Sequence, residues 1–306
     1  MSRTRIGVVI PTMNSSATIE ATLRSVINQS IDGPLLVRVQ DNSSTDHTLE
    51  IVARISESID KKAEISVEID SQPDSGVAQA LNIAFQNLDA DLLTWLGSDD
   101  LLIPGAINTV SSLVEQTDAR WVTGLPTAID MSDRQFSLLH EKGVHRYPSG
   151  FPQFLLQRGL FGNGIFGGVQ QEGTFWTREL WEQSGGFLNE NYRLAFDFEL
   201  WTRMARYSEL VQVVAMTAAF RVRPNQLSSN TVLYAKEKNQ VRKSLRQHAH
   251  QGKAGFSARQ LQRPIAYRTL ENDSWTVKRF TVRGKPLNHA SETARHTRPL
   301  PKLSRG

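Results

Sequence analysis

Short apolar runs alternate with stretches of helical periodicity through the first 120 residues. The apolar runs have the length of buried strands and lie at 6–10, 35–39, 65–69 and 91–96. Between them, apolar residues recur at helical spacing over 17–28, 46–55 and 76–88. Strands and helices in this order form a mostly parallel sheet with helices on both faces. The first 120 residues are therefore predicted to form an α/β sheet.

The pattern becomes mixed after residue 120. Further strands are predicted at 121–125, 210–214 and 218–222, and helices at 177–184 and 196–207. Residues 131–170 are rich in Gly, Phe and polar groups and have poor periodicity, which is typical of a functional loop region. We therefore expect one domain over 1–230, with halves at 1–120 and 121–230.

Charge divides the chain near residue 230. Residues 231–306 contain 17 Lys and Arg against 4 Asp and Glu, a net charge of +13, which leaves the first 230 residues at −9. A helix is predicted over 232–248, and roughly the last 50 residues are predicted to be loosely ordered. The C-terminal region 231–306 is thus predicted to be a basic extension, helical to disordered.

The predicted helix of this extension supports more than one hypothesis. Its cations are Lys236, Lys238, Arg242, Lys243 and Arg246. Its apolar residues are Leu233, Val241 and Leu245. The helix could bind an anionic membrane surface through residues 232–285, pack on the catalytic domain, or form an oligomer contact. A solvated extension with no partner is the remaining alternative.

Composition narrows the function classes. The chain has no cysteine, which excludes disulfides, thiolate catalysis and cysteine-ligated zinc. No apolar run approaches the roughly 18 residues of a membrane span, and the first run is too short for a signal-peptide core. A cytoplasmic protein is the default expectation, with peripheral attachment at the inner face of the membrane as a further hypothesis.

Two adjacent carboxylates follow the fourth predicted strand, in Gly97-Ser98-Asp99-Asp100. Ligands of open α/β sheets bind at the carboxyl ends of strands. Adjacent carboxylates stay ionised together when they share a cation, and oxygen ligands suit Mg²⁺ or Mn²⁺, which complete their shells with substrate phosphates. The alternative is a solvated turn that caps the helix after Pro104.

Polar loops also follow the first three predicted strands, at 11–14, 41–46 and 72–76. Right-handed crossovers place all four loops at one edge of the sheet, which outlines a nucleotide site. Asp41 could accept a hydrogen bond from a base or a ribose, whereas Asp46 is predicted to cap a helix. No glycine-rich fingerprint or Walker sequence is present, which argues against dinucleotide dehydrogenases and P-loop enzymes.

The chain resembles a family 2 glycosyltransferase of the GT-A fold. The matching segments follow the family's order and lie at 9–14, 40–46, 74–76, 80–82, 97–100, 170–176, 185–187 and 197–201. The resemblance implies a GT-A-like fold with a Rossmann-type, mostly parallel sheet. It also implies a nucleotide-diphosphate sugar donor, a divalent metal (Mn²⁺ or Mg²⁺) and inversion at the sugar carbon.

The resemblance implies roles for individual residues. The residues expected to bind the donor are Pro11, Thr12, Asn14, Asp41, Asp74, Asp99 and Arg223. The expected metal ligands are Asp100 and Asp99, with Asp100 the more direct. Asp197 matches the catalytic base, and Glu172 and Trp176 match the acceptor side.

Several alternatives accompany these roles. Asp197 could instead cap the helix at 196–207, and Glu199 is the alternative base. Arg223 stands where similar enzymes often have a His. Either the acidic pair holds the ion without a third side chain, or Arg223 takes part of its charge role by pairing with diphosphate.

Three tryptophans, Trp176, Trp181 and Trp201, could each stack on a sugar or fill the core. The core is favoured for Trp181 and Trp201, because a Trp in a helix is more often buried than part of a sugar site. Trp176 lies beside the Glu172 segment, and both roles stay open for it.

The leading hypothesis is a metal-dependent glycosyltransferase of surface polysaccharide biosynthesis. Its partners would be a nucleotide-diphosphate sugar and a glycan or lipid-linked acceptor, and no nucleic acid is expected. One alternative is a sugar-phosphate nucleotidyltransferase, although residues 11–14 lack the Gly-rich, Arg-containing loop of those enzymes. The other alternative is a non-catalytic nucleotide-binding scaffold.

Overall fold

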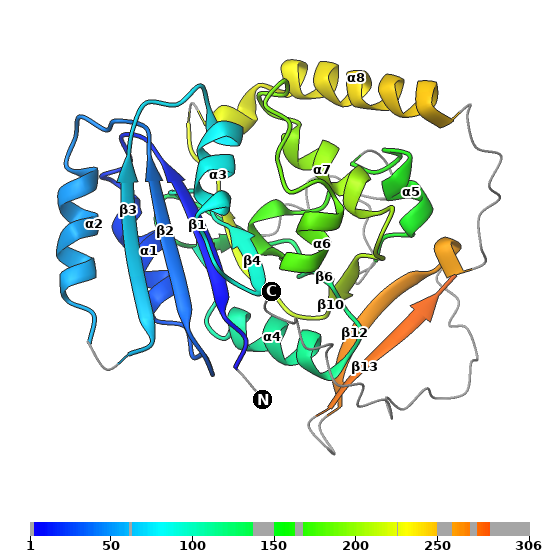
Figure 1. Cartoon of the computed structure of the whole chain (residues 1–306), viewed down its shortest axis with the longest axis horizontal. Helices are drawn as coiled ribbons and strands as arrows, with labels where there is room; N and C mark the ends of the chain where they lie inside the picture. The colour runs from blue at the N-terminus through cyan, green and yellow to red at the C-terminus, as the bar shows by residue number, and fades with distance from the viewer. Residues whose placement is uncertain are drawn as a thin grey trace, which may run out of the picture.

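A nine-stranded mixed sheet runs through the centre of the protein (Figure 1). The structure is a computed structural model that describes residues 3–60, 63–136, 150–162, 168–224, 226–249, 259–269 and 274–281. The strand order is β13-β12-β10-β6-β9-β4-β1-β2-β3. The strands are β1 (Ile6–Thr12), β2 (Leu35–Asp41), β3 (Ile65–Ser71), β4 (Leu92–Trp95), β6 (Trp121–Thr123), β9 (Thr174–Thr177), β10 (Val211–Val213), β12 (Arg263–Thr269) and β13 (Ser274–Phe280). Only β9 and β13 run antiparallel to their neighbours in this sheet, so the predicted mostly parallel α/β sheet is confirmed.

Helices cover both faces of the sheet, because its central strands are apolar on both sides. Successive side chains of a strand point to opposite faces, so Val8 joins one core cluster and Val9 the other. The cluster around Val8 includes α1 (Ile19–Ile27), α2 (Thr48–Glu57) and α4 (Ala106–Gln116). The cluster around Val9 includes α3 (Val77–Gln86), α5 (Gln153–Gln157), α6 (Arg178–Gln183), α7 (Phe196–Met204) and α8 (Thr231–Ala249).

A second, four-stranded sheet lies beside the acidic pair. It contains β5 (Leu101–Leu102), β11 (Ala218–Arg221), β7 (Ala128–Ile129) and β8 (Gln135–Phe136). The first of these strands begins directly after Asp100 and pairs antiparallel with β11, with Leu101 opposite Ala219. This pairing brings the segment from 218 to 224 alongside the acidic pair, although more than 110 residues separate them in the sequence.

The prediction that roughly the last 50 residues are loosely ordered is wrong for 263–269 and 274–280. These residues form β12 and β13, which extend the main sheet through parallel pairing of β12 with β10. Ala266 and Trp275 are buried, and the Trp275 indole donates to the Ser112 hydroxyl of α4 at 2.9 Å. Residues 282–306, like residues 137–149 and 163–167 of the predicted functional loop, lie outside the described residues.

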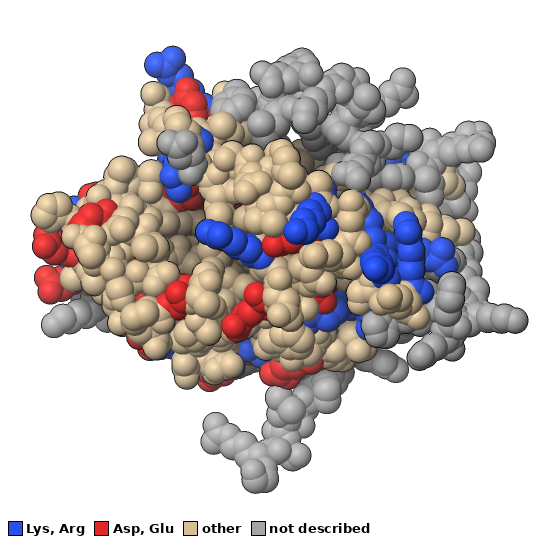
Figure 2. All heavy atoms as spheres, turned by 90° about the horizontal axis from the view of Figure 1, so that it is seen from above, with Lys and Arg blue, Asp and Glu red and all other residues tan. Residues whose placement is uncertain are grey.

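The helix of the basic extension, α8, packs on the preceding part of the chain. This was one of the roles that the sequence left open for it. In Figure 1, α8 crosses above α7, and its Val241 is buried in the core. Lys238 is buried too, and the Arg242 guanidinium donates to the Gly159 carbonyl at 2.7 Å, so these two of the five cations do not face outward. Figure 2 looks down on α8 and shows other Lys and Arg side chains along it. Across the described ranges, no helix is both long and apolar enough to cross a membrane.

Candidate functional site

The loops after β1, β2 and β3 meet at one edge of the sheet and are joined by hydrogen bonds. The Asn14 side chain accepts from the Thr45 amide at 2.9 Å. The Asn42 side chain donates to the Asp74 carboxylate at 3.0 Å and accepts from the Asp74 amide at 3.0 Å. These contacts hold three of the four predicted loops together, as the crossover rule requires.

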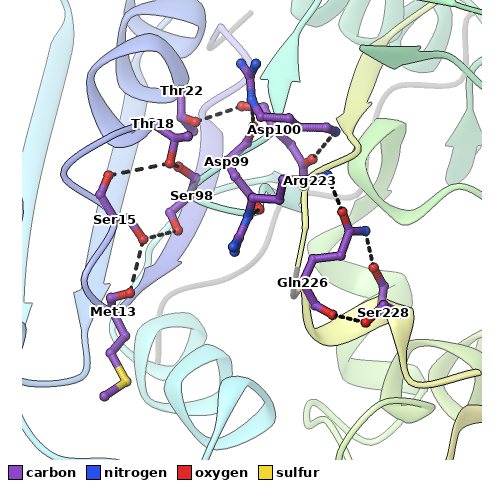
Figure 3. A network of polar contacts seen from close by, with 12 residues as sticks. Met13, Ser15, Thr18, Thr22, Ser98, Asp99, Asp100, Arg223, Gln226 and Ser228 are labelled. Carbon is purple, nitrogen blue, oxygen red and sulfur yellow. Dashed lines mark hydrogen bonds and ion pairs between the residues drawn. The ribbon is translucent and has the colours of Figure 1, made fainter. Parts of the chain in front are cut away.

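Hydroxyl groups from α1 and the loop before it hold the fourth loop, which carries the acidic pair (Figure 3). The hydroxyls of Ser15 and Ser98 lie 2.8 Å apart. Thr18 donates to the Ser98 carbonyl at 2.9 Å, and Thr22 donates to the Asp100 carbonyl at 2.8 Å. Because these bonds go to Ser98 and to a backbone carbonyl, the two carboxylates are not needed to anchor the loop to α1.

The two carboxylates fold back over Gly97. A Cβ at this position would collide with Asp100 Oδ2 and lie 3.1 Å from Asp99 Oδ1. Asp100 is only 4 % exposed, and burial, followed by the charges of Glu172 and Asp99, raises its pKa well above the usual range. Two carboxylate oxygens that converge on one space in this way fit a hard divalent cation.

Within the described residues, no group of three or more acidic or histidine side chains is placed to hold a metal ion. Of the described residues, Asp99 and Asp100 would therefore hold the ion, with further ligands from phosphate oxygens and water, as is common for Mg²⁺.

A buried arginine that the sequence analysis missed, Arg221, supports the acidic pair from β11. Its amide donates to Asp100 Oδ1 at 2.8 Å, and its Nε donates to the Asp99 carbonyl at 2.6 Å. Its Nη1 forms an ion pair of 2.6 Å with Asp133, and the side chain is 3 % exposed. A charged residue at the end of an apolar strand was the only available sequence signal.

Arg223 forms an ion pair with Asp99. Its side chain is 41 % exposed, in contrast to that of Arg221. The guanidinium therefore lies directly at the acidic pair while remaining open to solvent. Its pairing with a diphosphate stays a prediction.

Three residues at the nucleotide edge have distinct environments. Asp41 is fully buried and accepts from the Ser44 amide at 2.8 Å and the Ser71 hydroxyl at 2.7 Å, so it holds two loops. The Thr12 hydroxyl is buried and has no hydrogen-bond partner within the described part of the protein, which is uncommon. Asp46 accepts from the Thr48 amide at 3.0 Å, but the cap position of α2 belongs to His47, so the prediction that Asp46 caps this helix is wrong.

Asp197 lies in the first turn of α7 and is not its cap, because Ala195 occupies that position. Its Oδ1 accepts from the Phe198 amide at 2.6 Å. Burial raises the pKa of Asp197 to about 6, against the opposing effects of the Phe198 amide and the Lys238 charge. The carboxylate is thus more basic than an ordinary Asp and still largely ionised at neutral pH.

Glu172 connects the acidic pair with Asp197. It lies in the short 3₁₀ helix η1 (Gln171–Gly173), where the Gln171 side chain donates to the Trp95 carbonyl at 2.7 Å. Burial, together with the charges of Asp197 and Asp99, raises the pKa of Glu172 to about 7. Because both charges act on this one carboxyl, the two ends of the candidate site lie within electrostatic reach of each other.

The structure decides between the alternatives for Glu199. Both of its oxygens accept from Arg203 Nε, at 2.9 and 3.0 Å, and the pair is mostly buried. Arg203 also donates to the Phe187 carbonyl at 2.7 Å. Glu199 is therefore a structural partner of Arg203 and is poorly placed to accept a proton from an acceptor.

The acceptor-side assignment of Trp176 needs correction. This residue is 0 % exposed, and its ring lies 5.1 Å from that of Trp95 and 5.8 Å from that of Trp201. It belongs to the core, as do Trp181 and Trp201. Because the Trp176 side chain is fully buried among other aromatic rings, it has no exposed surface on which a sugar could stack.

Comparison with known proteins identifies the family. The family described as Glycosyl transferase family 2 matches residues 7–169, more than half of the chain. A protein named uncharacterized glycosyltransferase from Haemophilus influenzae is 22% identical over 246 residues, which cover 79% of this chain and 72% of that protein. The GalNAc(5)-diNAcBac-PP-undecaprenol beta-1,3-glucosyltransferase of Campylobacter jejuni is 21% identical over 207 residues, or 62% of this chain and 64% of that enzyme.

Solved structures share the fold. The crystal structure of S. aureus TarS in complex with UDP-GlcNAc superposes with a TM-score of 0.61 at 12% identity, over 82% of this chain and 68% of that one. The mannosyltransferase PcManGT from Pyrobaculum calidifontis, in complex with GDP-Man and Mn²⁺, gives 0.56 at 18% identity, over 83% and 67%. With its central sheet and its carboxylates at the predicted edge, this chain belongs to glycosyl transferase family 2 and is a glycosyltransferase of the GT-A fold.

Proposed function

We propose that this chain is a metal-dependent, inverting glycosyltransferase of surface polysaccharide biosynthesis. It would move a sugar from a nucleotide-diphosphate donor to a hydroxyl of a glycan or lipid-linked acceptor. The observation that carries the proposal is the convergence of the Asp99 and Asp100 carboxylates over Gly97, beside the exposed guanidinium of Arg223 that pairs with Asp99. A single in-line displacement needs a base at one end of the site and positive charge on the departing diphosphate at the other.

At the donor end, Asp99 and Asp100 would hold the divalent cation, which when bound neutralises charge on the leaving diphosphate. Arg221 keeps the loop in place through the Asp100 carboxylate and the Asp99 carbonyl. Arg223 lies on Asp99 with an exposed guanidinium, and we expect it to pair with phosphate oxygens when the donor binds. The unpartnered Thr12 hydroxyl is expected to contact the nucleoside.

At the acceptor end, Asp197 would remove the proton of the attacking hydroxyl. A base works best when its pKa lies near the working pH, and burial moves this carboxylate in that direction. Glu172, with a pKa of about 7, can carry a proton and bind the acceptor without adding a full negative charge beside Asp197. No nucleophilic Ser or Cys is needed for inversion.

The relatives support the class of substrates. Their names include UDP-GlcNAc and GDP-Man as bound donors, Mn²⁺ as a bound ion and an undecaprenol-linked acceptor. The family assignment argues against the nucleotidyltransferase and scaffold alternatives. The donor sugar would depend on loops that differ among such enzymes.

A panel of nucleotide sugars tests the proposal. We expect one class, for example UDP- or GDP-sugars, to raise the melting temperature in the presence of Mn²⁺. A ligand at 100 times its Kd stabilises a protein by about 2.7 kcal/mol. We also expect the protein to release UDP or GDP from the same nucleotide sugar that raises its melting temperature. Absence of both effects for every sugar, or turnover of a nucleoside triphosphate with a sugar 1-phosphate instead, would contradict the proposed function.

We further propose that the outer face of α8 binds an anionic membrane that carries the acceptor. Lys236, Lys243 and Arg246 are exposed there, and each cation near such a surface contributes about 1 kcal/mol. Changing all three to Glu is expected to abolish salt-sensitive co-sedimentation with anionic liposomes. Arg24→Glu with Arg54→Glu, on α1 and α2 across the sheet, is the control. Equal pelleting with anionic and neutral liposomes, or none with either, would remove the membrane role.

A further inference from the structure

A buried carboxylate of α8 binds the backbone directly ahead of the candidate base. Glu237 is 6 % exposed, and it accepts hydrogen bonds from three consecutive amides. These come from Arg193 at 3.0 Å, Leu194 at 2.8 Å and Ala195 at 2.9 Å. The next two residues are Phe196, where α7 begins, and Asp197.

These three bonds hold the segment that leads into α7, which has no side-chain cap of its own. The first amides of a helix have no partner within the helix and usually bind a side-chain oxygen at the cap position. The residue at that position of α7 is Ala195, which has no such oxygen. Glu237, 42 residues further along the chain, binds the amides of Ala195 and of the two residues before it, and its negative charge lies near the positive end of the helix dipole.

The part of α8 that carries Glu237 is itself held in place. One turn further along α8, Val241 is buried in the core and Arg242 donates to the Gly159 carbonyl at 2.7 Å. The Arg242 guanidinium also lies 5.3 Å from the ring centroid of Phe198, which follows Asp197. The carboxylate therefore belongs to a rigid part of the helix.

The same stretch of α8 also lies against the candidate base. Lys238 lies 4.4 Å from the Tyr234 ring and 5.9 Å from the ring of Phe198. Burial and the charges of Asp197 and Glu172 raise the pKa of Tyr234. Thus α8 packs against the first turn of α7 and also anchors the segment that leads into it.

We propose that Glu237 is a positioning residue for the catalytic base, and that α8 is an integral part of the catalytic site. The inference rests on the proposed role of Asp197. Without the three bonds, the 193–195 segment and the first turn of α7 lose their anchor. A displacement of about 1 Å in a catalytic group can cost up to about 10²-fold in rate.

Glu237→Gln tests the anchor first, without reference to catalysis. A Gln has one carbonyl oxygen, and its NH₂ group would face a backbone N–H, so at least one of the three bonds is lost. Hydrogen exchange of the Arg193, Leu194 and Ala195 amides is expected to accelerate at least tenfold. The control is Gln240→Ala, an exposed position of the same helix, with unchanged exchange. Unchanged protection in Glu237→Gln would overturn the proposal.

Turnover tests the positioning role. With UDP-GlcNAc and GDP-mannose as donors, we expect Glu237→Gln to lower kcat for UDP or GDP release about 10- to 100-fold and to leave donor KM unchanged. The Gln240→Ala control keeps wild-type kcat. If Glu237→Gln does not fold, Glu237→Asp, which keeps the charge on a shorter side chain, is expected to show the same kcat-only loss. Wild-type kcat in a folded variant would overturn the proposal.

A double-mutant cycle identifies the group through which Glu237 acts. Combined with Asp197→Asn, the Glu237→Gln change is expected to cause no further loss, because the base is already absent. If the fold-losses of kcat in the two single variants multiply in the double variant, Glu237 acts through a group other than Asp197, and the proposal is overturned. Wild-type turnover of Asp197→Asn alone would instead refute the proposed base, and the exchange result for Glu237 would stand independently.

Discussion

We expect Asp197→Asn to lower kcat by about 10²-fold or more and to leave the Kd of the nucleotide sugar nearly unchanged. The loss is the usual scale for removal of a general base. Asn has nearly the shape of Asp and can still accept from the Phe198 amide, so the start of α7 stays intact. Steady-state release of UDP or GDP gives kcat, and titration calorimetry with the same donor gives Kd.

Glu199→Gln is the matched control, since Glu199 lies two residues further along α7. Because both Glu199 oxygens bind Arg203, we expect this variant to lose some stability and to keep its turnover. An active Asp197→Asn together with an inactive Glu199→Gln would assign the base to Glu199.

The pH profile provides a second test of the base. Asp197 accepts a proton only when ionised, and burial raises its pKa to about 6, so kcat/KM is expected to fall as the pH drops through about 6. The charge of Asp197 also acts on Glu172, whose pKa is raised to about 7. The fall in kcat/KM at low pH therefore reflects the titration of both carboxyls together. A wild-type profile that is flat between pH 5 and pH 8 would argue against a buried carboxylate base.

We expect Asp100→Ala to abolish transfer and the Mn²⁺-dependent part of UDP or GDP binding and to leave the fold intact. The variant removes the carboxylate that we propose as the more direct metal ligand. It also removes a buried charge whose pKa is raised by burial, Glu172 and Asp99, so it relieves repulsion. Calorimetry with UDP or GDP, with and without Mn²⁺, measures the effect. Wild-type activity that survives excess EDTA would overturn metal dependence.

Gly97→Ala is a companion variant that keeps both carboxylates. The added methyl group would occupy the space on which Asp99 Oδ1 and Asp100 Oδ2 converge. We therefore expect weaker Mn²⁺-dependent nucleotide binding, with the fold and the charge of the site unchanged. Normal binding in this variant would show that the ion lies elsewhere.

Much of the fold could be predicted from the sequence, because buried parallel strands and amphipathic helices leave periodic patterns. The predicted strand at 35–39 lies inside β2 (Leu35–Asp41), and the predicted helix at 76–88 contains α3 (Val77–Gln86). The handedness of crossovers then placed the polar loops at one edge. The strands β12 and β13 were missed, because their short apolar stretches lie next to arginines and lysines in a strongly basic region.

Other features depended on contacts between distant segments, which no local pattern records. Arg221 was missed because its partners, Asp99 and Asp133, come from other loops. Trp176 was assigned to the acceptor side because it lies beside the Glu172 segment in the sequence, whereas its neighbours in space are Trp95 and Trp201.

The sequence by itself determined the α/β sheet, the family and the acidic loop after the fourth strand. These depend on side-chain periodicity and on motifs within a few residues. Only the tertiary structure decided which side chain holds the segment ahead of the candidate base, Asp197. Glu237 has the local sequence of a solvated helix face, Lys236-Glu237-Lys238, and yet it is buried. Packing of α8 on α7 brings its carboxylate to the amides ahead of Asp197, and a contact between two helices has no signature within either one.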